Sequence, residues 1–84
     1  MKLNEQRKKI DMIDQEIATL FNKRFKVIKE IKKIKKQEDM KVTHQKREEE
    51  IIHKNQAFVD EEYRAYFIDF YKHLISLSKA YQEK

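Results

Sequence analysis

The feature that most constrains this chain is a regular series of apolar residues that continues to about residue 34. Seven of them step alternately by three and four positions, and Arg24 takes the one missing step: Ile10, Ile13, Ile17, Leu20, Val27, Ile31 and Ile34. Such steps place side chains on one face of an α-helix. The sequence contains neither glycine nor proline, so nothing interrupts this period. We therefore predict one helix from Leu3 to about Lys36.

A helix of this length cannot be covered by the rest of an 84-residue chain. It would extend roughly 50 Å at about 1.5 Å per residue, whereas a compact domain of this size has a radius of gyration of only about 12 Å. A single short chain also buries only a modest core. Either the helix stands out as a coiled-coil arm, or a second copy of the chain packs antiparallel along it.

The rest of the chain predicts two more helices. The apolar period lapses over residues 37–42, where we expect a loop, and Thr43 offers a hydroxyl N-cap for a short second helix that ends near residue 55. After a break over residues 55–59, Asp60 is expected to cap a third helix. Its apolar residues alternate by four and three: Tyr63, Phe67, Phe70, Leu74, Leu77 and Tyr81. The predicted fold class is all-α, with three helices of which one is very long.

The composition excludes several classes of function. Without cysteine there is no disulfide, thiolate metal site or cysteine nucleophile, and without glycine there is no glycine-rich phosphate loop. The three histidines, His44, His53 and His73, form no pair at i and i+4, so we predict no metal site. The sequence has no leader-like apolar segment and no run near the ~18 apolar residues of a membrane span. We expect a cytoplasmic protein.

The charge balance favours an anionic partner. The formal net charge is +5, which would attract nucleic acid, a membrane surface or a small polyanionic metabolite. Arg24 is the most informative cation, because a buried guanidinium in an apolar seam must be paired or bound to a ligand. It could line a pocket for an anion, or it could pair with Glu48 or Glu49 or reach solvent.

Arg7 and Lys35 share a heptad position but lie roughly 42 Å apart along the predicted helix at about 1.5 Å per residue. No small ligand can contact both within one chain. In an antiparallel pair of such helices, Arg7 of one chain can approach Arg24 and Lys35 of the other. Alternatively, Arg7 and Lys35 are ordinary solvated charges that flank the seam.

Two polar pairs accompany the shorter helices. Arg47 and Glu48 follow the first loop and could project back onto the first helix. Ser78 and Gln82 lie four positions apart and therefore on one face of the third helix, where the amide could donate a hydrogen bond into a pocket. Alternatively, the side chains of each pair are polar groups exposed to solvent.

Together these residues resemble the all-helical (type II) chorismate mutase family over nearly the whole chain. Arg7, Ile10 and Asp14 are similar to the opening R-x-x-I-x-x-[IL]-D segment of the family. The other matches are the mid-helix arginine, the catalytic lysine eleven residues later, the arginine-glutamate step of the second helix and the closing S-x-x-x-Q, at Arg24, Lys35, Arg47, Glu48, Ser78 and Gln82.

The resemblance implies a single domain over residues 1–84, in an intertwined six-helix homodimer. It implies the Claisen rearrangement of chorismate to prephenate in the biosynthesis of phenylalanine and tyrosine, with no cofactor. The enzyme then acts by holding the reactive conformer and by stabilising developing charge. As catalytic residues it implies Lys35 and Gln82, which hydrogen-bond the ether oxygen, and Glu48, which accepts from the ring hydroxyl.

The resemblance also implies the residues that bind the chorismate dianion. Arg7 of the partner chain and Arg24 would hold its two carboxylates, because a guanidinium suits bidentate contact. Ser78 would assist at a carboxylate, and Arg47 would order the site. His44 stands where the family commonly has an aspartate that helps to recognise the hydroxyl, and we include it among the substrate-binding residues.

Three other functions remain open. Isochorismate pyruvate lyase shares this fold and a similar cationic pocket, although the presence of Arg47, Glu48 and Gln82 favours the mutase. A basic helical arm could bind nucleic acid through Lys29, Lys32, Lys33, Lys35 and Lys36 with steep salt dependence. A purely structural coiled coil would leave Arg24 in the seam without a reason. We predict an enzyme that binds neither nucleic acid nor membrane.

Overall fold

The computed structural model describes residues 2–41 and 45–84. Within these ranges the chain is helical and contains no strand. Its elements are α1 (Lys2–Gln37), α2 (Gln45–Gln56), a short 3₁₀ turn η1 (Glu61–Tyr63) and α3 (Arg64–Glu83). The prediction of an all-α fold with three helices and a very long first helix is confirmed. The predicted cap residue Thr43 lies outside the described residues.

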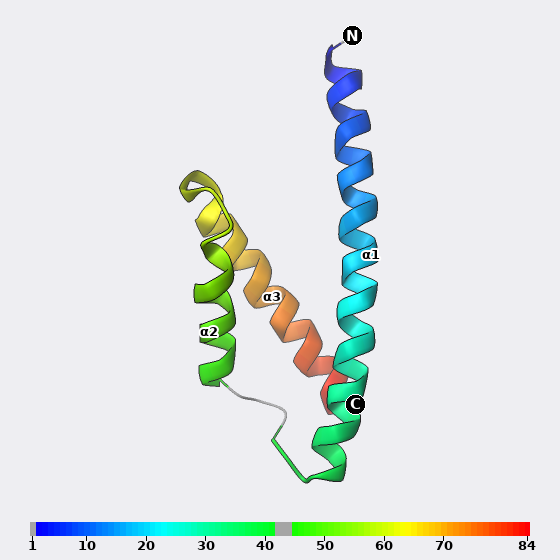
Figure 1. The fold of residues 1–84 in the computed structure, drawn as a ribbon, viewed down its shortest axis with the longest axis vertical. Helices are drawn as coiled ribbons and strands as arrows, with labels where there is room; N and C mark the ends of the chain where they lie inside the picture. Colours follow the sequence, from blue (N-terminus) through cyan, green and yellow to red (C-terminus); the bar gives the residue numbers. More distant parts are fainter. Residues whose placement is uncertain (1, 42–44) are drawn as a thin grey trace.

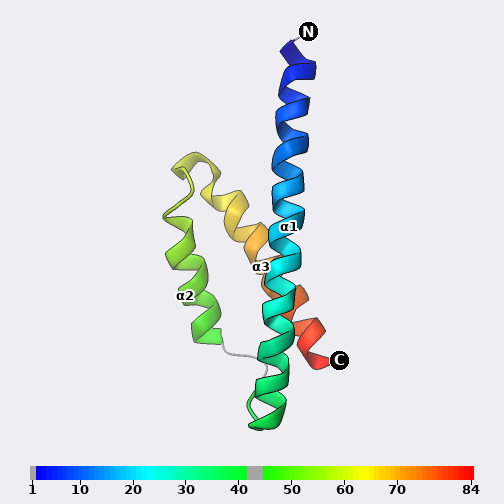
Figure 2. The same cartoon turned by 45° about the vertical axis from the view of Figure 1, so that its right-hand side comes forward.

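The length of α1 sets the shape of the molecule. α1 has 36 residues and so extends about 54 Å at about 1.5 Å per residue. The whole chain measures 56 × 24 × 16 Å, and its radius of gyration of 15.9 Å exceeds the roughly 12 Å of a compact domain of this size. In Figure 1, α2 and α3 lie on one side of α1, and the N-terminal half of α1 (blue) stands clear of both. Figure 2 shows α3 crossing α1, with its C-terminal end on the side opposite α2, while the N-terminal part of α1 again stands clear of both.

The N-terminal half of α1 carries an uncovered apolar stripe. Four of its seam residues have between 50% and 60% of their surface exposed: Ile10, Ile13, Ile17 and Leu20. Full burial of one such side chain is worth about 1.5–3 kcal/mol. An apolar face of this extent on a helix that no other described segment covers indicates a surface that packs against something else.

An aromatic pair joins α1 to α3. The ring of Phe25 on α1 lies edge-on to Tyr81 on α3 with ring centres 5.7 Å apart. Within α1, the ring centre of Phe25 lies 4.6 Å from that of Phe21. Ile75 and Ser78, both on α3, are the two buried residues in the described part of the chain. So small a core agrees with the expectation that one short chain buries little surface.

The start of the third helix differs from the prediction. Asp60 makes no hydrogen bond through its side chain, and a 3₁₀ turn separates it from α3. An N-cap carboxylate normally accepts from the second or third N–H group of the helix. Here the third N–H, that of Tyr63, already donates to the backbone carbonyl of Asp60 at 2.9 Å. Arg64 then begins α3, and its Nε donates to the carbonyl of Val59 at 2.8 Å.

Two residues after the end of α1, Asp39 has a left-handed backbone conformation with a φ of 54°. The N–H of Met40 donates to the carbonyl of Lys35 at 2.7 Å, and the N–H of Asp39 donates to the carbonyl of Lys36 at 3.4 Å. These two bonds form a Schellman motif, in which glycine usually takes the left-handed position. In a sequence without glycine, aspartate tolerates this conformation better than most residues. At this motif, which includes the carbonyl of Lys35, the chain turns away from the axis of α1.

We predict that Asp39→Gly raises the free energy of unfolding by about 0.5–1 kcal/mol. A left-handed residue with a Cβ atom costs about 1–2 kcal/mol, and the relief exceeds the entropy that glycine adds to the unfolded chain. Asp39→Ala is the control and should lower the free energy of unfolding. Urea unfolding at one fixed protein concentration measures both. Equal stability of the two variants would contradict the motif.

Candidate functional site

A cavity of about 620 Å³ lies between the C-terminal half of α1 and the two shorter helices. This volume falls in the range of ligand pockets, about 300–1,000 Å³. The floor is partly apolar, with Ile28 and Ile31 from α1 and Ile75 from α3. Six of the eight predicted site residues line the cavity: Arg24, Lys35, Arg47, Glu48, Ser78 and Gln82. The fold therefore brings together residues up to 58 positions apart in the sequence.

The other two predicted site residues do not line this cavity. Arg7 is exposed and precedes Arg24 by seventeen positions on the same helix, a separation of about 26 Å at about 1.5 Å per residue. It therefore cannot reach the cavity of its own chain. His44 lies outside the described residues.

Arg24 is oriented by two neutral groups. Its Nη1 donates a hydrogen bond to Oγ of Ser78, and its guanidinium lies over the ring of Tyr71, 5.7 Å from the ring centre. Ser78 is only 4% exposed and is itself fixed, because its Oγ donates to the carbonyl of Leu74 at 3.0 Å. Within the described part of the chain these contacts leave the positive charge of Arg24 without a neutralising carboxylate. The alternative in which Arg24 pairs with Glu48 or Glu49 is not observed among the described residues.

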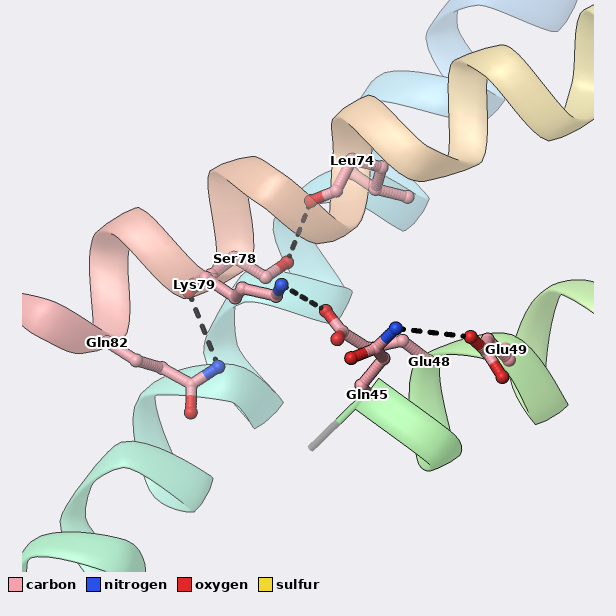
Figure 3. A network of polar contacts seen from close by, with 7 residues as sticks. All are labelled: Gln45, Glu48, Glu49, Leu74, Ser78, Lys79 and Gln82. Atoms are coloured by element: carbon pink, nitrogen blue, oxygen red, sulfur yellow. Dashed lines mark hydrogen bonds and ion pairs between the residues drawn. The ribbon is translucent and has the colours of Figure 1, made fainter. Parts of the chain in front are cut away.

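Glu48 instead pairs with a lysine that the sequence reasoning missed. Nζ of Lys79 lies 2.7 Å from Oε1 of Glu48, joining α3 to α2 across the wall of the cavity (Figure 3). The contact is an ion pair whose angles do not fit a hydrogen bond, and among the described residues Oε1 of Glu48 has no hydrogen-bond partner. Lys79 lies four positions after Ile75 and therefore on the same helix face, but this spacing does not distinguish it from the other lysines of the chain.

Gln82 places an unsatisfied polar atom in the cavity wall. Its Nε2 donates to the backbone carbonyl of Ser78 at 3.3 Å, and its amide oxygen points away from this bond (Figure 3). Among the described residues that oxygen is buried without a hydrogen-bond partner, which costs about 1–3 kcal/mol. A bound ligand or water that donates to it would remove this cost.

The cavity is strongly cationic. Among the described residues that line it, one carboxylate, Glu48, faces five cations: Arg24, Lys35, Arg47, Lys54 and Lys79. Such a concentration of one charge sign in a partly enclosed site attracts a ligand with more than one negative charge. Lys54 and Lys79 were not predicted, because single lysines in a lysine-rich sequence carry no distinctive spacing.

The lysine-rich end of α1 is engaged within the chain. Nζ of Lys32 lies 4.9 Å from the ring centre of Tyr81, and Nζ of Lys33 lies 3.4 Å from a carboxylate oxygen of Glu30. Lys35 lines the cavity. Three of the five lysines considered as phosphate contacts thus have neighbours in their own chain, which weakens the case for a nucleic-acid arm.

Residues 2–41 and 45–84 offer neither a metal-binding cluster nor a helix that could span a membrane. No group of three or more histidine, cysteine or acidic side chains is arranged to hold a metal ion there. In the same residues, no helix is both long and apolar enough to cross a membrane.

The fold and the cavity together define a class: all-helical proteins with a cationic cavity between one long helix and two short ones. The sequence model of the chorismate mutase type II family matches residues 6–83. The chain belongs to this family, and the predicted resemblance is confirmed. Membership supports chorismate mutase activity, an isomerase reaction, in general terms. Comparison with curated proteins and with solved structures gave no significant match.

We predict that Ser78→Ala lowers the free energy of unfolding by about 1 kcal/mol relative to Ser76→Ala. The first change removes a nearly buried hydroxyl that accepts from Arg24 and donates to Leu74, and such hydrogen bonds are worth about 0.5–1.5 kcal/mol each. Ser76 is exposed on the same helix and controls for the higher helix propensity of alanine. Urea unfolding measures the difference. Identical midpoints would show that the hydroxyl does not hold Arg24.

Proposed function

We propose that this protein is a homodimeric chorismate mutase that converts chorismate to prephenate in the biosynthesis of phenylalanine and tyrosine. One observation carries the proposal: six residues that match the family motifs line a single cationic cavity. Chorismate is a dianion, so its charge complements that cavity. The cavity offers binding and charge rather than a nucleophile, which fits a unimolecular rearrangement.

In this rearrangement the ether C–O bond breaks while a new C–C bond forms within the same molecule. No atom is transferred to or from the protein. The enzyme can accelerate such a step by holding the compact conformer in which the two ends meet. It can also place positive charge and hydrogen-bond donors where negative charge grows, which is on the ether oxygen.

Arg24 is the proposed anchor for one carboxylate. Ser78 and Tyr71 hold the guanidinium in place before the ligand arrives. The side chain of Arg24 therefore loses little conformational entropy on binding. The second carboxylate binds Arg7 of the partner chain, where a planar fork again suits bidentate contact. Ser78 assists at the carboxylate held by Arg24, and Arg47 orders the rim.

Lys35 and Gln82 are the proposed partners of the ether oxygen. Both line the cavity, and Nε2 of Gln82 carries a second hydrogen besides the one donated to Ser78. Glu48 accepts from the ring hydroxyl through the carboxylate oxygen that does not contact Lys79. His44, which lies outside the described residues, is a further proposed substrate-binding residue in place of the aspartate common in the family.

The exposed stripe on α1 supports the dimer. If Arg7 of one chain reaches a ligand held between Arg24 and Lys35 of the other, residue 7 lies opposite about residue 29 in an antiparallel pair. The two-fold axis then passes near residue 18, about midway between the two. This point lies within the uncovered stripe from Ile10 to Leu20. The same pairing thus covers the stripe and completes both cavities.

We predict that Lys35→Ala and Arg24→Ala each lower kcat/KM for chorismate at least about 1,000-fold, because each removes a charge aimed at the substrate. Lys36→Ala, on the neighbouring exposed lysine, should retain activity. The assay follows the loss of chorismate absorbance, with dimer formation and helix content checked for each variant.

Identification of the product, with chorismate and separately with isochorismate as substrate, distinguishes the two enzymes that share this fold. Prephenate supports the mutase. Pyruvate released from isochorismate would support the lyase instead. Activity near the wild-type level in Lys35→Ala would contradict the assignment of the site.

We predict that Arg7→Ala and Arg24→Ala chains, each inactive alone, regain about a quarter of wild-type activity when refolded together in equal amounts. Half of the dimers would be mixed, and each mixed dimer would have one intact site of two, because its Arg7 and Arg24 come from different chains. The measurement is chorismate turnover of the mixture against each variant alone. Without any recovery, Arg7 does not act across the interface.

A further inference from the structure

We propose that Lys79 sets the specificity of this site by neutralising Glu48, so that the site selects a substrate with a hydroxyl rather than an ammonium group at the ring position that Glu48 contacts. The inference rests on the proposed function for the identity of the substrate. It concerns a residue that none of the family motifs includes.

The geometry places Lys79 beside the group that reads the ring substituent. Its Nζ lies 2.7 Å from Oε1 of Glu48, and the two side chains are 34% and 18% exposed. Lys79 extends from α3 and Glu48 from α2, and they meet at the wall of the cavity that both line (Figure 3). A partly desolvated pair at this distance interacts more strongly than one on an open surface.

The charges around Glu48 determine whether its carboxylate favours a neutral or a charged hydrogen-bond donor. Glu48 is the one carboxylate among the described residues that line the cavity, and Lys79 compensates its charge. An ionised carboxylate has about four lone-pair sites on two oxygens, so it can still accept a hydrogen bond from a neutral hydroxyl. An ammonium group in the same place would meet Lys79 and the remaining cations of the cavity. Juxtaposed like charges reject the wrong ligand.

If the ion pair only held α2 and α3 together, its removal would have a different effect. A pair that merely joined α2 to α3 would contribute to the stability of the protein alone. Its loss would lower the stability of the protein and affect all ligands alike. A change in preference between two ligands that differ in one charge therefore distinguishes selection by Lys79 from simple joining of the helices.

The experiment compares the wild-type protein with Lys79→Gln, Lys79→Arg and Lys72→Gln. The probes are chorismate and the analogue in which an ammonium group replaces its ring hydroxyl. Calorimetry gives the Kd of the analogue, steady-state kinetics give KM and kcat for chorismate, and circular dichroism checks the helix content. Lys72 is the matched control, because it is exposed on α3 and does not line the cavity.

We expect Lys79→Gln to bind the amino analogue at least about tenfold more tightly than the wild-type protein, because the change leaves Glu48 as an uncompensated carboxylate. The KM for chorismate should not fall. Lys79→Arg, which keeps the charge, and Lys72→Gln should stay within about twofold of wild type. An unchanged Kd of the analogue in a folded Lys79→Gln variant, or no detectable binding to any of the proteins, would overturn the proposal.

The two readouts separate this proposal from the proposed function. Turnover of chorismate by the wild type, with no gain in analogue binding on Lys79→Gln, overturns the role of Lys79 alone. Tighter analogue binding in a protein that does not turn over chorismate supports charge selection by Lys79 and overturns the mutase activity.

Discussion

The rest of this structure depends on an apolar stripe along α1 that is longer than the chain can cover. Over the C-terminal half of α1, α3 provides a surface through the contact of Tyr81 with Phe25. Over the N-terminal half, the residues from Ile10 to Leu20 remain exposed among the described residues. The hydrophobic effect favours a second surface there. We propose that a second copy of the chain provides this surface and also completes the site.

Arg24 takes one position of the apolar seam and lines the cavity. An apolar residue at this position would extend the seam, whereas the guanidinium must be held by polar neighbours. Ser78 and the ring of Tyr71 hold it without neutralising its charge. Together with Lys35, Arg47 and Lys54 in the described lining, Arg24 gives the cavity a positive charge that favours an anion, at the expense of packing. Glu48 and Lys79 balance one another at the other wall and leave that positive charge unchanged.

Much of the site could be predicted because its residues lie on regular helices. Arg24 is conspicuous as the one charged residue in an apolar period, and Ser78 and Gln82 share a helix face through their spacing of four. Lys54 and Lys79 could not be singled out, because they resemble the many solvated lysines of a basic chain. The expected side-chain cap at Asp60 was wrong, because the competition between carboxylate and backbone carbonyl for one N–H group is decided by local dihedral angles. Sequence does not contain those angles.

The sequence by itself determined that the chain is helical, that its first helix outgrows the domain, and that a cation interrupts the seam. Those properties follow from residue spacing and from the absence of glycine and proline, which act locally along the chain. Only the tertiary structure decided which charges meet. It placed Lys79 on Glu48 rather than Arg24 on Glu48, and it set Arg7 far from the cavity of its own chain. Contacts between helices depend on how α2 and α3 pack against α1, and the period of one helix carries no information about its distance to another.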